Sequence, residues 1–301
     1  MIAARPWPTG DERARNGPVL RRAERLVERQ LGCHVERVMV ISHTPGRHHV
    51  LQVDTDAGAV VVKSFRRRDD AAALFNNLNR LQDEPFDVLR APGPLAFCAK
   101  EAMVVMALLS GQPLTIASDA TTIQQAGRAL AELHALPLRG NDRHVDLHGQ
   151  IAELVSPHPA ELAAALPAWR AVIDGALGRL TAFRSRNAAV LLHRDFHLRQ
   201  LLAEGDRVAV VDWDLLAAGD PTFDIVYFTT YLETHHAGDG LGESFLAGYR
   251  GNDHSHDDYG AGLDTYRVFN LLRRASRRFR LRDEGWQEEL ERMLAALEQA
   301  L

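Results

Sequence analysis

Residues 191–202, LLHRDFHLRQLL, decide how this chain folds. Two further acidic segments follow them, VAVVDWD at 208–214 and GDPTFD at 219–224. Short apolar runs bounded by polar turns are typical of buried strands, and such runs lead into Asp195 and Asp212. We therefore expect these two acids at the ends of short strands, on loops that can hold carboxylates close together.

Residue types in this pattern match the needs of phosphoryl transfer, where positioning and charge stabilisation dominate the barrier. One carboxylate positions the acceptor hydroxyl and takes its proton, and another holds a magnesium ion that bridges phosphate oxygens. A second oxygen ligand five residues after the first acid completes the metal site, and a strand lysine contacts the nucleotide phosphates. The groups available for these roles are Asp195, Asp212, Gln200 and Lys63.

The predicted secondary structure changes along the chain, from mixed strands and helices in the first third to mainly helices afterwards. Apolar spacing predicts helices at 19–31 and 69–81, after a loose leader up to about residue 17. Strands are predicted at 35–41, 49–54, 59–65, 95–98 and 102–108. After 110–113 the pattern is helical, except for short strands at 189–192 and 208–211. The sequence thus predicts an α+β protein with an N-terminal lobe at 1–109 and a C-terminal helical lobe at 110–301.

Composition narrows the function classes. The chain has 301 residues, a formal net charge of -5 and two cysteines. A mildly acidic chain is a poor nucleic-acid binder, and two cysteines are too few for a disulfide framework. No apolar run is long enough for a membrane span or a secretory signal. We expect a cytoplasmic protein without a nucleic-acid or membrane partner; the sequence gives no indication of its oligomeric state.

The motifs resemble known kinases. His193-Arg194-Asp195 resembles the catalytic loop of protein kinases. With His197 and the GDPTFD segment, the run resembles more closely the aminoglycoside phosphotransferase and choline kinase family. The segments VVMALLSGQPL at 104–114 and ALAELH at 129–134 are similar to that family's hinge and following helix. The resemblance spans roughly 35–231.

The resemblance implies a bilobal protein-kinase-like fold, with a small antiparallel sheet in one lobe and helices in the larger one. It implies ATP and Mg²⁺ as cofactors and a small-molecule hydroxyl as acceptor. Asp195 would be the catalytic base or hydroxyl-positioning acid, and Asp212 the main magnesium ligand with Gln200. Lys63 would contact the phosphates, and the backbone from Met106 to Leu108 would face the adenine.

Three positions depart from the family pattern. Gln200 stands where asparagine is usual, so the amide oxygen survives on a side chain one methylene longer. The helix after Lys63 lacks the expected glutamate partner, and Asp70 is the nearest substitute. The turn between the first two strands, TPGRH at 44–48, has no glycine-rich phosphate loop.

These departures leave alternatives open. A catalytically silent pseudokinase that binds nucleotide or regulates a partner is one. A protein kinase is another, although no Ala-Pro-Glu segment follows Asp212. The acceptor is also open: an acidic pocket from Glu233, Asp239, Glu243 and the 253–264 region would suit a cation, whereas nearby arginines would suit an anion. The arginine run at 273–280 is interpreted as a solvated helix face.

Overall fold

The computed structural model describes residues 11–44, 46–235, 240–251 and 260–301. It divides into two compact units. The first contains the chain up to Leu114 together with Arg199–Asp214. The second contains Thr115–Leu198 and Leu215–Leu301. The predicted lobe boundary at 109/110 stays a prediction, and the structure adds the 199–214 hairpin to the first unit.

A five-stranded antiparallel sheet forms the centre of the first unit, in the order β1-β2-β3-β6-β5. Its strands are β1 (Val35–Thr44), β2 (His48–Thr55), β3 (Gly58–Phe65), β5 (Pro94–Cys98) and β6 (Met103–Ala107). In the register, Lys63 of β3 lies opposite Val50 of β2 and Val104 of β6. Lys63 therefore occupies the central strand, flanked on both sides.

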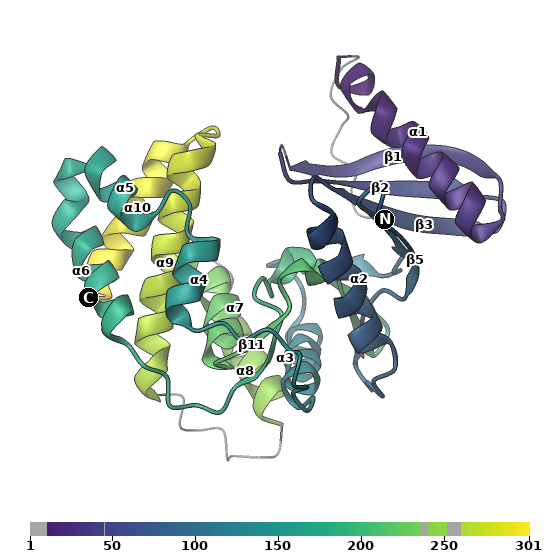
Figure 1. Ribbon diagram of the computed structural model, residues 1–301. Coiled ribbons are helices and arrows are strands. Elements are labelled where there is room, and N and C mark those ends of the chain that lie inside the picture. Colours follow the sequence, from purple (N-terminus) through teal and green to yellow (C-terminus); the bar gives the residue numbers. More distant parts are fainter. Residues whose placement is uncertain (1–10, 45, 236–239, 252–259) are drawn as a thin grey trace. The chain divides into compact units, whose positions relative to one another are not determined.

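Helix α1 (Asp11–Leu31) packs along this sheet, as Figure 1 shows. Ala23, Leu26 and Val27 of α1 are buried against apolar strand side chains such as Leu51 and Val62. Helix α2 (Arg68–Gln82) contacts β3, β5 and β6. Its buried residues recur at helical spacing (Ala71, Leu74, Leu78 and Leu81). Each helix thus buries an apolar stripe, which is the main driving force for this arrangement.

A second sheet of the first unit carries the 199–214 hairpin. Its strand order is β4-β10-β9-β7, with bounds Leu89–Arg90, Arg207–Val210, Leu201–Glu204 and Gln112–Pro113. Strands β9 and β10 pair antiparallel, with Leu201 opposite Val210. Gly205 has φ 59° in the connecting turn, a conformation that glycine adopts without strain. The two residues just outside the pair, Gln200 and Val211, consequently lie together.

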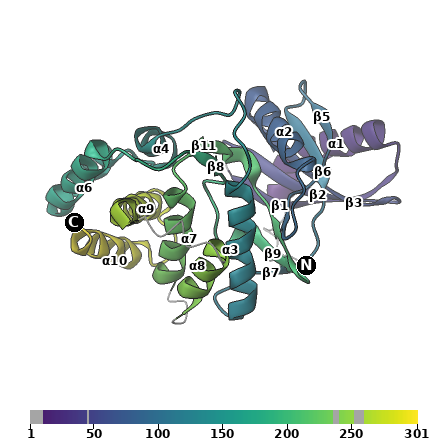
Figure 2. The same cartoon turned by 90° about the horizontal axis from the view of Figure 1, so that it is seen from below.

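The second unit is mainly helical (Figures 1 and 2). Its helices are α3 (Ala120–His134), α4 (Leu147–Leu154), α5 (Pro159–Ala165), α6 (Arg170–Ala182), α7 (Thr222–Thr234), α8 (Leu241–Arg250), α9 (Gly260–Leu281) and α10 (Trp286–Gln299). Its largest apolar core joins α9 to α6, α7 and α10, with Phe269, Ile173, Phe223 and Leu294 all buried. Two short strands, β8 (Val190–Leu192) and β11 (Ala217–Gly219), pair antiparallel, and β8 ends just before His193.

Helices α3 and α8 approach so closely that their backbones touch. A Cβ on Gly127 of α3 would overlap the carbonyl oxygen of Phe245, and one on Gly248 of α8 would overlap that of Gln124. Backbone atoms cannot move aside as a flexible side chain can, so both positions require glycine.

The structure confirms most predicted elements and corrects some. The first helix begins at Asp11 rather than at 19 and continues through Pro18; residues 1–10 lie outside the described residues. The helical pattern predicted after 110–113 is interrupted around Pro167, because proline lacks the N–H that helix continuation needs. Strand β9 is an additional strand between those predicted at 189–192 and 208–211.

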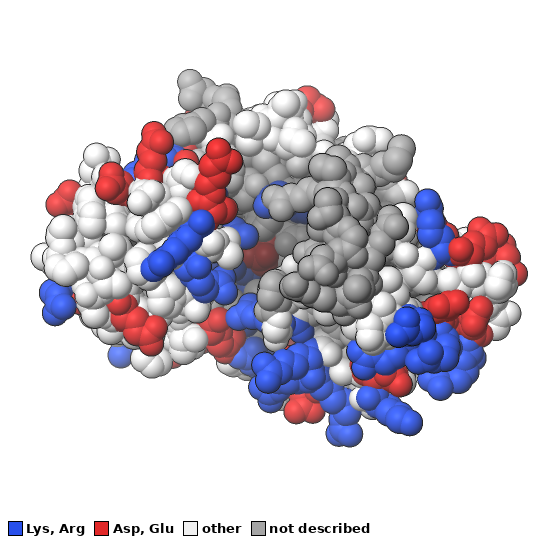
Figure 3. Space-filling model, turned by 90° about the horizontal axis from the view of Figure 1, so that it is seen from above, with Lys and Arg blue, Asp and Glu red and all other residues white. Residues whose placement is uncertain are grey.

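The surface carries both signs of charge. Figure 3 shows lysine and arginine side chains beside acidic ones on the face that it presents. Among the described residues, no helix has both the length and the apolar character needed to cross a bilayer. The cytoplasmic location stays a prediction.

Candidate active site

Lys63 binds two carboxylates in the first unit. Its ammonium lies 2.6 Å from Asp212 Oδ1 and 2.7 Å from Asp214 Oδ2. The lysine side chain is only 5% exposed. Burial opposes its charge, but the charges of Asp212 and Asp214 prevail and raise the pKa of Lys63. A buried, fully charged lysine therefore marks the point on which both acids converge.

The hairpin of β9 and β10 brings Gln200 to Asp212. The backbone N–H of Val211 donates to the carbonyl oxygen of Gln200 at 2.9 Å. The side-chain amide of Gln200 in turn donates to Asp212 Oδ2 at 3.3 Å. Asp212 itself has φ 69°, a left-handed conformation that is uncommon outside glycine and that clusters at functional sites. The two predicted metal ligands thus lie side by side.

Asp214 lies in an unusual electrostatic environment. Burial raises its pKa to about 6, and the neighbouring charge of Asp212 raises it as well, while Lys63 opposes both effects. Its Oδ1 is buried and has no hydrogen-bond partner among the described residues. On β2, burial and the charge of Lys63 lower the pKa of His48 to about 4, so this imidazole is neutral at physiological pH.

These donors fit a magnesium ion. Mg²⁺ prefers oxygen ligands and is usually held by one or two carboxylates together with substrate phosphates. Asp212 and Asp214 converge on one cation, the lysine ammonium, and Asp214 keeps a buried oxygen without a partner. No cluster of three or more His, Cys, Asp or Glu that could hold a metal occurs among the described residues.

Three other predicted nucleotide contacts belong to the first unit. Asp70 is exposed in the first turn of α2, and it forms no ion pair with Lys63, although its charge contributes to the raised pKa of Asp214. Met106 pairs with Val61 within the sheet and is buried. Leu108 is 38% exposed just after β6, and its backbone N–H and C=O bond to no described residue. Its backbone is therefore available to a ligand.

The catalytic-loop residues in the second unit are held by one buried acid. Asp224 of α7 accepts from the backbone N–H of His193 at 2.7 Å and from that of Arg194 at 2.8 Å. Arg194 has φ 69°, and its fully buried side chain donates to Gln150 and Glu153 of α4. His193 Nδ1 accepts from the Asp195 N–H at 3.3 Å. The loop conformation that presents Asp195 is thus fixed from several directions.

Asp195 is bound by three side chains. Its Oδ1 accepts from the Tyr227 hydroxyl and from Arg273 Nη2, both at 2.9 Å, and its Oδ2 lies 3.5 Å from His197 Nε2. Burial would raise the pKa of Asp195, but the His197 hydrogen bond and the Arg273 charge hold it well below its usual range. Asp195 is therefore ionised throughout the physiological pH range, with its side chain 20% exposed.

A column of stacked rings begins at this carboxylate. His197 stacks on Tyr231 with ring centroids 4.8 Å apart, and Tyr231 stacks on His235 at 4.0 Å. The guanidinium of Arg274 lies 5.6 Å from the Tyr231 ring centre. The column thus connects Asp195 to Arg274 within the second unit.

Sequence reasoning missed Tyr227, Arg273 and Arg274. The prediction that the 273–280 arginines form a solvated face is wrong for Arg273 and Arg274, while Arg277 and Arg280 are exposed. Arg273 directly follows the buried Leu272, at the border of the apolar stripe of α9. A side chain at that border can point along the core toward a partner. The place of Arg273 at this border was the feature of the sequence that could have identified it as a largely buried partner.

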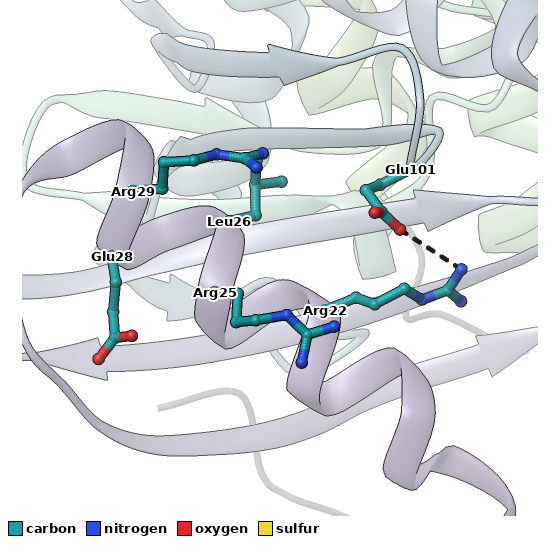
Figure 4. Close-up of a pocket in the computed structure, with 6 residues that line it drawn as sticks. All are labelled: Arg22, Arg25, Leu26, Glu28, Arg29 and Glu101. Atoms are coloured by element: carbon teal, nitrogen blue, oxygen red, sulfur yellow. Dashed lines mark ion pairs between the residues drawn. The ribbon is translucent and has the colours of Figure 1, made fainter.

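One pocket of the first unit lies apart from this chemistry. It has a volume of about 430 Å³ and is lined by α1 residues and by Glu101 of the β5–β6 turn. Figure 4 shows Arg22 pointing to Glu101, with which it forms an ion pair at 3.6 Å. None of the Lys63, Gln200, Asp212 or Asp214 side chains lines it. The pocket does not coincide with the candidate site.

Together, the sheet unit with its paired lysine and the helical unit with its braced catalytic loop define a kinase-like protein. The model of the phosphotransferase enzyme family matches residues 43–269. The chain belongs to that family, and the predicted enzyme class, a phosphotransferase, is confirmed. This membership gives no support to the pseudokinase alternative. A comparison with curated protein sequences finds no match.

Solved structures share the fold over nearly the whole chain. Macrolide 2'-phosphotransferase MphH from Brachybacterium faecium is 20% identical, with a TM-score of 0.62 and coverage of 93% of this chain and 98% of that one. Amicoumacin kinase hAmiN, bound to AMP-PNP, Ca²⁺ and Ami, is 14% identical with a TM-score of 0.67, covering 92% and 93%. Choline kinase from Cryptosporidium parvum is 11% identical with a TM-score of 0.65, covering 88% of each chain. The predicted α+β, kinase-like fold is confirmed.

Proposed function

We propose that this phosphotransferase moves the γ-phosphoryl group of ATP, with magnesium, to a hydroxyl group of a small molecule. The observation that carries the proposal is the buried ammonium of Lys63 between Asp212 and Asp214. The AMP-PNP and Ca²⁺ in the amicoumacin kinase structure support a nucleotide and a divalent cation. Choline and macrolides are the acceptors that the names of two similar proteins print.

In the proposed reaction, each unit contributes a separate part. Lys63 binds the nucleotide phosphates, and the Leu108 backbone faces the base. Asp212, Asp214 and the Gln200 amide oxygen would hold magnesium, which neutralises phosphate charge when bound. Gln200 presents its amide nitrogen to Asp212 here, and a rotation of the amide would present the oxygen instead.

Asp195 would position the acceptor hydroxyl. Because Arg273 and His197 hold its pKa low, Asp195 is a weak base. Phosphoryl transfer passes through a loose transition state in which little proton removal is needed early, so a firmly held, ionised carboxylate suits the orientation of the nucleophile. The proposed division of labour places Lys63 and the Leu108 backbone in 1–109, and Asp195 with the acceptor contacts in 110–301.

Thermal unfolding with and without nucleotide tests this proposal. At a ligand concentration of roughly 100 times Kd, binding stabilises the folded state by about 2.7 kcal/mol, which raises Tm by a few degrees. We expect a magnesium-dependent rise with ATP and ADP that Asp212→Ala abolishes. Asp174→Ala, on an exposed position of α6, is the control. No rise with any nucleotide would contradict the proposal and restore the pseudokinase or scaffold alternative.

A further inference from the structure

Arg274 of α9 is a partly buried cation. Its Nε is buried and has no hydrogen-bond partner among the described residues. Its Nη2 lies 3.4 Å from His235 Nδ1, but that nitrogen also lies 2.8 Å from the Tyr231 carbonyl oxygen. A carbonyl oxygen can only accept, so His235 Nδ1 carries the hydrogen and cannot accept from Arg274. The Arg274 guanidinium, itself a hydrogen-bond donor, thus faces the N–H donor of His235.

No described carboxylate forms an ion pair with Arg274, although the charge of Arg274, after those of Arg292 and Arg278, contributes to the lowered pKa of Glu289. The neighbouring arginines have their own acids: Arg278 pairs with Asp283 at 2.9 Å, and Arg292 pairs with Glu289 at 2.8 Å. Burial, with smaller contributions from the charges of Arg278 and Arg277, lowers the pKa of Arg274 to about 10, while Tyr227 and Tyr231 oppose this effect. The guanidinium also makes a cation–π contact with the Tyr231 ring. Such a group is costly for the folded protein unless a ligand satisfies it.

The described acids that could have bound a cationic acceptor are either paired with an arginine or exposed on their helices. Glu233 pairs with Arg267 at 2.5 Å. Glu243 and Asp264 are exposed on their helices. Asp239 and most of the 253–264 acids lie outside the described residues. Among the described groups near the ring column, the unsatisfied charge is therefore positive.

We propose that the acceptor is a hydroxyl-bearing anion, a carboxylate or a phosphate ester, whose negative group Arg274 binds. This inference rests on the proposed kinase function. The planar guanidinium offers paired N–H donors that match the oxygens of carboxylate and phosphate. The stacked rings of His197, Tyr231 and His235 connect this cation to Asp195, and an alcohol held by Arg274 at one end presents its hydroxyl toward Asp195.

Calorimetric binding to the full chain, saturated with magnesium and AMP-PNP, tests the inference. The probes are glycerate and glycerol 3-phosphate, which separate the two anionic classes, with glycerol and choline as neutral and cationic counterparts. We expect saturable binding of at least one anion, at least tenfold tighter than glycerol or choline. Arg274→Met should weaken it at least tenfold, and Arg274→Lys should weaken it less. Arg277→Met, an exposed arginine on the same helix, should change it less than twofold.

The remaining outcomes separate this inference from the proposed function. Thermal unfolding of Arg274→Met should give an unchanged or higher Tm, because the variant loses an unsatisfied cation; a purely structural arginine would give a lower one. Failure of every anion to bind, anion binding that Arg274→Met leaves intact, or preference for choline overturns the inference alone. Anion binding through Arg274 in a chain that does not bind AMP-PNP contradicts the kinase function but not the anion site.

Discussion

Arg273 on α9 lies 2.9 Å from Asp195, so a helix 78 residues further along the chain holds the catalytic-loop carboxylate. The same guanidinium donates to the Arg194 carbonyl oxygen at 3.3 Å and stacks over Tyr227 at 4.6 Å. The position and charge of Asp195 therefore depend on α9 as much as on its own loop.

Asp195→Asn should separate binding from turnover. The amide keeps the shape but loses the charge that orients the acceptor hydroxyl, so turnover should fall by about 10²- to 10⁴-fold. The affinity for magnesium nucleotide should stay within about twofold of wild type, because the nucleotide ligands belong to the other unit. ADP release with an accepted alcohol and calorimetry with AMP-PNP provide the two measurements. Wild-type turnover in this variant would exclude the role of Asp195.

Arg273→Met should change how stability depends on pH. In the wild type the lowered pKa of Asp195 means that its stabilising contribution is present above the unfolded pKa of about 3.9 and is lost only as pH falls through the lower folded value. Without Arg273 that pKa rises, although the His197 hydrogen bond, which lowers it more than Arg273 does, remains. The ionised Asp195 then contributes less stability at neutral pH than in the wild type, and this difference shrinks as pH falls through the raised pKa.

Urea unfolding between pH 7 and about pH 3, which spans the unfolded pKa of about 3.9, measures this effect. The variant should be less stable by about 3–5 kcal/mol at pH 7, and the gap should shrink on acidification by about 1.4 kcal/mol for each unit of pKa change. For Arg277→Met, the difference in unfolding free energy from wild type should not shrink on acidification. A gap that is constant over this range would mean that Arg273 does not control the ionisation of Asp195.

Asp224→Ala should unfold the catalytic loop locally or destabilise the whole unit. The substitution leaves the buried N–H groups of His193 and Arg194 without acceptors, at about 1–3 kcal/mol each. Denaturant unfolding should show a combined loss of about 2–6 kcal/mol. The exposed Asp174→Ala should lose less than about 0.5 kcal/mol. Equal stability of both variants would show that Asp224 does not brace the loop.

Gly248→Ala tests the close crossing of α3 and α8. A methyl group there meets the Gln124 backbone, so the helices must separate, at about 1–3 kcal/mol. Gly242→Ala lies on the same helix, where an added Cβ meets nothing within 4 Å. That change should be neutral or stabilising, because alanine favours helix. Thermal unfolding compares the two, and equal Tm values would contradict the crossing.

Local sequence patterns determined the sheet strands, the main helices and the positions of Lys63, Gln200 and Asp212. Alternation of apolar and polar residues identifies strands from short windows, and an acid just after such a strand lies at its end. The convergence of Lys63 on Asp212 and Asp214 was not predicted: Asp70 was expected as the nearest partner of the lysine, but it is exposed. Which carboxylates pair with Lys63 depends on how β3 packs against the segment that carries Asp212 and Asp214, which lies about 150 residues further along the chain.

The family resemblance, the kinase-like fold and the acids on short loops could be predicted, because they follow from local periodicity and from motif order along the chain. The side chains that surround Asp195, and the arginine whose Nε lacks an acceptor among the described residues, result from tertiary packing. Tyr227 and Arg273 contact Asp195 from positions 32 and 78 residues further along the chain, and Arg274 follows Arg273 on α9. No window of sequence records such contacts, because long-range packing, not local propensity, determines which face of α9 is buried and where its arginines point.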